Sequence, residues 1–225
     1  MTKVLIFGAT GMVGQGALRE CLLDPGVEQV VCVGRAHSGG ADPKLRDIVL
    51  SDLFAVGERE AELTGFDACF FCLGVSVVGL AEADYTRVTY QLPVTVAEVL
   101  ARLNPGMTFV HVSAQGADER SRFMWARVKG RTERALGALP FKATYILRPG
   151  FIQPLHGIKS KTGWYNVLYA LTAPLASALA TFFPAAATTT EKIGRAMIAV
   201  TRDGYSKKIL ESADVNLVAI DRGMA

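Results

Sequence analysis

The sequence FGATGMVG, residues 7–14, decides the fold of this chain. It follows a short apolar run, VLIF, at residues 4–7, which is typical of a buried β-strand. It leads into MVGQGALRECLL, residues 12–23, where Val13, Ala17 and Cys21 recur at the spacing of one helix face. The glycines at positions 8, 11 and 14 therefore form the turn between a first strand and a first helix.

Each glycine of this turn suits one part of a dinucleotide site. Gly8 allows a tight turn, Gly11 lets the backbone approach a pyrophosphate, and Gly14 allows the helix to pack closely on the strand. Amides at a helix N-terminus attract anions, so the expected phosphate-binding residues are Gly8, Thr10, Gly11, Met12, Val13 and Gly14. The alternative is a tight strand-to-helix turn that binds nothing.

Strand and helix patterns alternate along the rest of the chain. Apolar runs predict strands near residues 28–34, 47–53, 67–74, 107–113, 143–150 and 207–212, and periodic stretches predict helices near 82–103, 121–139 and 191–200. Pro93 is expected to kink or divide the first of these helices, and Thr188 with Glu191 forms a capping-box pattern before the last. The alternation predicts an α/β fold: a doubly wound parallel sheet of the Rossmann NAD(P)-binding type, as one domain over residues 1–225.

The end of the second strand favours NADP as the cofactor, with NAD as the alternative. An NAD site expects an acidic residue there to bind the ribose 2′-hydroxyl, whereas this sequence has Arg35. A guanidinium suits a 2′-phosphate; the competing interpretation is a solvated surface arginine. Asp52 and Leu53, after the third strand, are expected to line an adenine pocket, and Gly74, after the fourth, to lie beside the adenosine.

Charge and cysteine content argue against several other classes of protein. The formal net charge is +3, from 24 basic and 21 acidic residues, and no basic run is longer than a pair, so no nucleic-acid partner is expected. Cys69 and Cys72 fall in one predicted strand, where residues three apart point to opposite faces, and this favours buried thiols over a metal or redox pair. The three histidines lack metal-ligand spacing, so no metal site is expected. No signal peptide is visible, and the expected location is the cytoplasm.

Residues 162–190 carry no charged side chain. The segment is long enough for a membrane span, but Pro174 interrupts it, and alanine and threonine lower its hydrophobicity. We expect a small C-terminal helical segment that acts as an apolar lid or interface over residues 156–187, in preference to a membrane contact through residues 164–183. An apolar surface of this kind favours a homodimer.

Five short motifs occur in a recognisable order. They are GATGMVG at 8–14, FFCLG at 70–74, HVSAQGAD at 111–118, VKGRTE at 128–133 and YILRPG at 145–150. Their order and spacing resemble the atypical short-chain dehydrogenases/reductases, and most closely the TIP30-like branch of that family. The resemblance covers residues 3–155 and implies a Rossmann-type fold that binds NAD(P).

The resemblance also implies roles for individual side chains. Ser113 matches the catalytic serine, Lys129 matches the lysine that holds the nicotinamide ribose, and Pro149 completes the expected cofactor-binding residues. The family's tyrosine, four residues before the lysine, is replaced by Trp125. An indole N–H donates a hydrogen bond but does not exchange its proton at ordinary pH, so Trp125 cannot serve as the general acid. The competing explanation of Trp125 is packing in the core on one face of an amphipathic helix. Tyr90 is an alternative proton donor.

Two functions are compatible with these observations. The first is an NADP(H)-dependent oxidoreductase or epimerase-like enzyme, acting on an unknown carbonyl or alcohol substrate with acid–base chemistry altered by Trp125. The second is a non-catalytic NADP(H)-binding sensor or regulatory interaction protein. A serine hydrolase built on His111 and Ser113 is disfavoured, because HVSAQG lacks the GxSxG turn.

Overall fold

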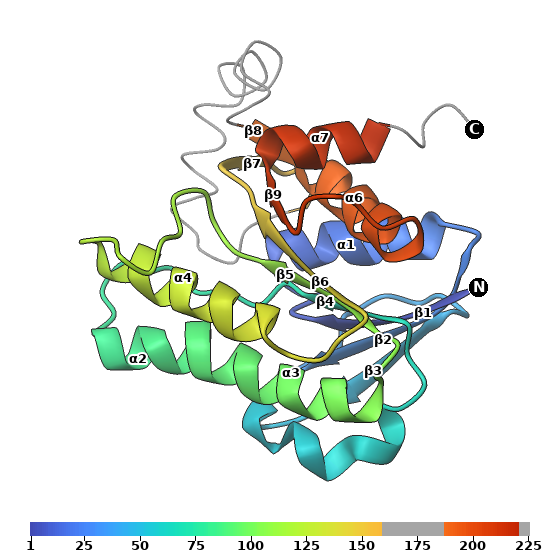
Figure 1. Ribbon diagram of the computed structural model, residues 1–225. Coiled ribbons are helices and arrows are strands. Elements are labelled where there is room, and N and C mark those ends of the chain that lie inside the picture. Colours follow the sequence, from blue (N-terminus) through green and yellow to red (C-terminus); the bar gives the residue numbers. More distant parts are fainter. Residues whose placement is uncertain (159–186, 221–225) are drawn as a thin grey trace.

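A seven-stranded parallel sheet forms the centre of the computed structural model, which describes residues 1–158 and 187–220 (Figure 1). The strand order is β3-β2-β1-β4-β5-β6-β9, and every neighbouring pair is parallel. The chain therefore builds the sheet outward from β1 in one direction and then from β4 in the other. The predicted doubly wound parallel sheet is confirmed.

The described elements follow the predicted alternation, with several additions. They are β1 (Thr2–Phe7), α1 (Met12–Leu23), β2 (Val27–Gly34), β3 (Leu45–Val49), the 3₁₀ segment η1 (Leu53–Glu62), β4 (Ala68–Phe71), α2 (Glu82–Thr86), the π-helical segment η2 (Arg87–Gln91), α3 (Leu92–Leu103), β5 (Thr108–Val112), α4 (Met124–Gly137), β6 (Ala143–Arg148), β7 (Phe151–Gln153), β8 (Ala187–Thr189), α6 (Thr190–Arg202), β9 (Ile209–Glu211) and α7 (Ser212–Ile220).

Side chains alternate between the two faces of the sheet, as they must in a strand that is covered on both sides. Along β1, Val4 and Ile6 belong to one buried cluster, whereas Leu5 and Phe7 belong to the other. Helices α1, α6 and α7 cover the first face, and η1, α3 and α4 cover the second (Figure 1). Cys69 packs in the second cluster and Cys72 against the first, so these two free thiols lie on opposite faces, as predicted.

The predicted helix over residues 82–103 is divided before Pro93 rather than at it. Between α2 and α3 the backbone widens into the π-helical turn η2, in which the amide of Leu92 donates to the carbonyl of Arg87. Pro93 then lies in the first turn of α3, where its missing N–H is tolerated. The wide turn brings η2 against α4, where the hydroxyl of Thr132 donates to the carbonyl of Thr89 at 2.9 Å.

Two features near the C-terminus differ from the prediction. The cap of α6 is Thr189, whose hydroxyl accepts from the amide of Lys192 at 3.1 Å. The predicted cap, Thr188, instead donates to the amide oxygen of Asn216 at 2.9 Å, so the capping pattern is one residue away from its predicted place. The second difference is a small two-stranded parallel sheet, formed by β7 and β8, which was not predicted from the sequence.

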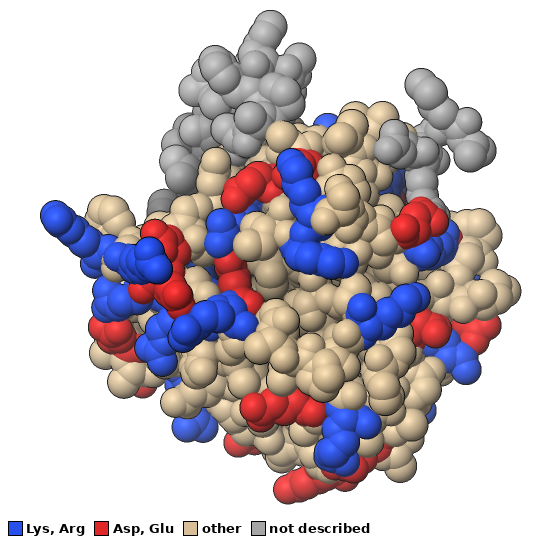
Figure 2. Space-filling model, in the orientation of Figure 1, with Lys and Arg blue, Asp and Glu red and all other residues tan. Residues whose placement is uncertain are grey.

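Most of the predicted lid segment at residues 156–187, and all of the proposed membrane contact at 164–183, lie outside the described residues. Among the helices that the structure describes, none is both long and apolar enough to cross a membrane. Basic and acidic side chains are interspersed on the face shown in Figure 2. The absence of a nucleic-acid partner stays a prediction.

Candidate functional site

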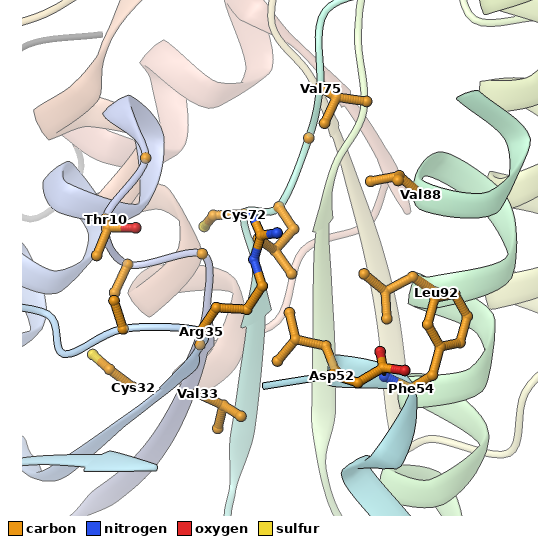
Figure 3. Close-up of a pocket in the computed structure, with 18 of the residues that line it drawn as sticks. Thr10, Cys32, Val33, Arg35, Asp52, Phe54, Cys72, Val75, Val88 and Leu92 are labelled. Atoms are coloured by element: carbon orange, nitrogen blue, oxygen red, sulfur yellow. Dashed lines mark hydrogen bonds between the residues drawn. The ribbon is translucent and has the colours of Figure 1, made fainter. Parts of the chain in front are cut away.

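A cavity of about 690 Å³ opens at the carboxyl ends of β1, β2 and β4. This is the edge at which the strand order reverses, between β1 and β4, and where open α/β sheets bind their ligands. Figure 3 shows Thr10 and Arg35 on one side of the cavity, and Asp52, Phe54 and Leu92 on the other. The cavity therefore lies between the glycine turn and the start of α3.

In the glycine turn, backbone segments approach one another too closely for a side chain. Gly8 has a φ of +87°, a conformation that favours glycine, and a Cβ there would lie 2.9 Å from the amide nitrogen of Leu73. A Cβ on Gly14 would lie 2.7 Å from the carbonyl carbon of Gly8 and 2.8 Å from the Cα of Ala9. Since real Cβ atoms do not approach so closely, α1 can pack against the turn only with glycine at position 14, the role predicted for it.

The N-terminus of α1 faces this turn without a side-chain cap. Gly11 occupies the cap position and has no side chain to cap the helix, and the first turn holds no acidic residue. First-turn amides have no acceptor within their own helix, and the helix dipole favours negative charge beside them. The turn therefore presents a place where an anion can be held by backbone alone.

The lining of the cavity includes two arginines and one carboxylate. Arg35, from the end of β2, is exposed and has no ion-pair partner among the described residues. Asp52 caps η1, its carboxylate accepting from the amide of Phe54 at 3.0 Å. Arg87, from η2, was not singled out by the sequence; its guanidinium carbon lies 4.7 Å from the centre of the Phe54 ring.

Ser113 lies directly after β5 and is buried, only 6% of it being exposed. Its hydroxyl donates to the carboxylate of Glu133, which lies one helical turn beyond Lys129 on α4. Glu133 is in turn held by Arg148, at the end of β6, whose Nε lies 3.1 Å from both carboxylate oxygens. Because a serine hydroxyl has a single proton, Ser113 in this arrangement can accept a hydrogen bond from a substrate but cannot donate one.

The charge of the partly buried Lys129 acts on the buried imidazole of His111. Burial lowers the pKa of Lys129 to about 8, although the nearby carboxylate of Glu133 acts in the opposite direction. Burial and the charge of Lys129 lower the pKa of His111 to about 3. His111 is 2% exposed, and neither ring nitrogen has a hydrogen-bond partner within the described residues. The imidazole is therefore neutral at working pH and unsatisfied, which is costly in a core.

The lowered pKa of Lys129 predicts a pH-dependent effect of the change Lys129→Met. Between about pH 8 and pH 10.5 the unfolded chain binds a proton at Lys129 that the folded protein does not, so the wild-type free energy of unfolding rises with pH in this window. Below about pH 8 the cost of the buried charge is fully present. Lys129→Met should thus be more stable than the wild type at pH 7, by roughly 2–3 kcal/mol, and this advantage should fade toward pH 10.5.

Urea unfolding at pH 7 and pH 10, followed by circular dichroism, measures this difference. Lys142→Met, which removes an exposed lysine, is the matched control and should show no such trend. An advantage for Lys129→Met that is constant with pH, or a lower stability at pH 7, would contradict the argument.

Trp125 and Tyr90 lie on different sides of the region around Lys129. The outer edge of the Trp125 indole packs against Gly116, in the loop after β5, at 3.5 Å from the position of a Cβ on that glycine. Trp125 is half-buried, and it packs against a loop rather than within the core. The ring of Tyr90 is covered by the guanidinium of Arg131, 5.0 Å away, two residues after Lys129 and so on the opposite side of α4. This orientation does not favour Tyr90 as a proton donor.

The structure brings together one group of the predicted site residues and separates another. Those that line the cavity are Gly8, Thr10, Gly11, Arg35, Asp52, Leu53 and Gly74. Those that do not line it are Met12, Val13, Gly14, Ser113, Trp125, Lys129 and Pro149. Pro149 is buried after β6, and its carbonyl accepts from the amide of Gln115 at 3.1 Å. Arg87, Phe54 and Glu133 were not predicted from the sequence; the only signal for Glu133 was its place four residues after Lys129 on the same helix face.

A family model described as the NAD dependent epimerase/dehydratase family matches residues 4–120, slightly more than half of the chain. The chain belongs to this family. The match confirms the resemblance to atypical short-chain dehydrogenases/reductases, while the TIP30-like branch stays a prediction. Among curated proteins, "Protein fmp52, mitochondrial" of Emericella nidulans is 33% identical over 159 residues, which are 68% of this chain and 67% of that protein.

Several solved structures share the fold. The chain matches a variant of ElxO with NADPH bound, with a TM-score of 0.70 and 14% identity, over 96% of this chain and 99% of that one. It matches DesIV, a dTDP-glucose 4,6-dehydratase from Streptomyces venezuelae with NAD and TYD bound, with a TM-score of 0.67 and 18% identity, over 97% and 80%. At these identities the likeness establishes the fold alone.

The prediction of where the protein resides is wrong. The expected cytoplasmic location is contradicted by the curated relatives, since fmp52 of Emericella nidulans and FMP52 of Kluyveromyces lactis are both named mitochondrial proteins. The cytoplasmic prediction rested on the absence of a visible signal peptide, which is weak evidence about where a protein resides.

Proposed function

We propose that this protein binds NADP(H) and acts as an oxidoreductase or epimerase-like enzyme on a carbonyl or alcohol substrate. The observation that carries the proposal is the glycine turn, whose uncapped helix start lies at the edge of a cavity that Arg35 also lines. Structures that share the fold hold NAD or NADPH, which supports a dinucleotide as the ligand class.

The residues around the cavity fit such a ligand. The backbone of Gly8, Thr10 and Gly11 would hold the pyrophosphate, because a side chain at these glycines would fill the space or strain the turn. Asp52 and Leu53 would border the adenine. Arg35 would face the ribose 2′-position, and its unpaired charge favours a 2′-phosphate there. A bound nicotinamide supplies hydride chemistry, which no side chain can provide.

The change Arg35→Ala tests the preference for NADP(H). A lost charge-assisted hydrogen bond to a phosphate should weaken NADPH binding by roughly tenfold or more, while NADH binding stays unchanged. Fluorescence titration of nucleotide-stripped protein with each nucleotide measures both dissociation constants. Arg122→Ala, which removes an exposed arginine outside the cavity, is the control. An equal loss for both nucleotides, or no loss for either, would count against a 2′-phosphate contact.

The proposed catalytic residues are Ser113 and Lys129. In the observed arrangement Ser113 would accept a hydrogen bond from a substrate hydroxyl while its own proton stays bonded to Glu133. Lys129, with its pKa near 8, would donate to the hydroxyls of the nicotinamide ribose. Trp125 in the tyrosine position would orient a carbonyl without protonating it.

Trp125 also favours the second candidate function, a protein that holds NADP(H) as a sensor or regulatory ligand without turnover. The change Trp125→Tyr distinguishes the two. If the site is catalytic, the variant should oxidise NADPH with aldehydes or ketones about 10²–10⁴ times faster than the wild type, since a general acid is restored. Trp125→Phe, which removes the indole without adding a hydroxyl, is the control. Nucleotide binding without turnover in all three proteins would favour the non-catalytic function.

A further inference from the structure

The far end of the cavity holds a stacked pair that neither the sequence motifs nor the family match assigns. Arg87 lies in the π-helical turn η2, and Phe54 lies at the start of η1. Both line the cavity, and the guanidinium carbon of Arg87 lies 4.7 Å above the ring of Phe54. At this distance the cation and the ring attract one another, so Phe54 holds the guanidinium in place before any ligand arrives.

Unlike the nearby Arg102 and Arg127, Arg87 has no carboxylate partner among the described residues. Arg102 pairs with Glu60 and Arg127 pairs with Glu82, both across neighbouring elements on the same side of the sheet. Arg87 forms no ion pair within the described residues, and its side chain is exposed. One face of its planar guanidinium therefore lies on Phe54, while the other is available to a ligand in the cavity.

The geometry points to Arg87 as the residue that stacks on the adenine ring of the bound nucleotide. This inference rests on the proposed function, since it concerns the same cavity. A guanidinium stacks on aromatic faces, and the surrounding walls, Leu53, Val88 and Leu92, are apolar and suit a flat ring. Arg35 and Arg87 then have separate tasks: Arg35 distinguishes the 2′-substituent, and Arg87 binds the adenine that NADPH and NADH share.

Titration of the full-length protein with NADPH and with NADH tests this division. Arg87→Ala should raise both dissociation constants by about the same factor, roughly tenfold, because the lost stacking is common to the two nucleotides. Arg87→Lys keeps the charge but loses the planar group, so it should recover little of the affinity. Arg131→Ala is a matched control, because Arg131 makes the same kind of contact with Tyr90 but does not line the cavity.

The outcomes separate this inference from the proposed function. If the wild type binds both nucleotides and Arg87→Ala leaves both dissociation constants unchanged, the proposed role of Arg87 is overturned and the cofactor site stays intact. A loss confined to NADPH, or full recovery by Arg87→Lys, would place Arg87 at a phosphate and overturn the stacking. A wild type that binds neither nucleotide would overturn the proposed function and this inference together.

Discussion

The change Gly14→Ala should destabilise the protein by about 3 kcal/mol and abolish tight binding of a dinucleotide. The added methyl group would overlap the carbonyl group of Gly8 and the Cα of Ala9, and both are backbone atoms that cannot rotate away. To remove this overlap, α1 would have to move away from the turn, and this movement displaces the amides proposed to hold the pyrophosphate. Urea unfolding and NADPH titration of the same preparation measure the two effects.

Gly137→Ala is the matched control for this variant. Gly137 is the last residue of α4, and a Cβ there would meet nothing within 4 Å. Both changes raise intrinsic helix propensity, by up to about 1 kcal/mol, so only the clash distinguishes them. Gly137→Ala should therefore be neutral or slightly stabilising. A Gly14→Ala protein as stable as this control would show that α1 does not pack on the turn as described.

The change Glu133→Met should cost about 3 kcal/mol, because it leaves Arg148 with only the more exposed Glu211, 3.5 Å away, as an ion-pair partner. The side chain of Glu133 is 5% exposed and that of Arg148 is 20% exposed, so water replaces little of the lost interaction. Ser113 would lose its acceptor in the same step. The double change Glu133→Met with Arg148→Met removes both charges and should recover most of the lost stability.

A surface ion pair that involves Arg134 of the same helix provides the comparison. Arg134 and Glu119 lie 3.0 Å apart with 73% and 37% of their side chains exposed, so Arg134→Met should change stability by less than about 1 kcal/mol. Unfolding in urea measures all four proteins. A single variant Glu133→Met that is as mild as Arg134→Met would contradict the buried network joining β5, α4 and β6.

The sequence was sufficient to predict the parts of the fold that depend on local pattern. Continuous apolar runs identify strands covered on both faces, and the glycine spacing identifies the turn after β1. The three-residue strands β7 and β8 were not predicted, because so short a stretch has no periodicity and the two strands are far apart in the sequence. Thr188 and Thr189 are adjacent and equally suited to capping; the contact of Thr188 with Asn216 leaves the cap to Thr189.

The candidate site was predicted less completely than the fold, for a physical reason. Residues of the glycine turn and of the strand ends can be predicted from their place in a motif. The predicted residues that line the cavity were identified in this way. Arg87 looks like a solvated helix residue in sequence, and only the fold brings it over Phe54. The hydrogen bond between Ser113 and Glu133 could not be predicted either, because the two residues come from different elements and meet only when α4 packs beside β5.

Calorimetric titration of nucleotide-stripped wild-type protein with NADPH tests the central claim most directly. The glycine turn, the uncapped start of α1 and Arg35 predict one binding site per chain, with tighter binding of NADPH than of NADH in a parallel titration. Absence of heat and of saturable binding with both nucleotides would mean that the turn serves the packing of α1 alone, and the proposed function would be wrong.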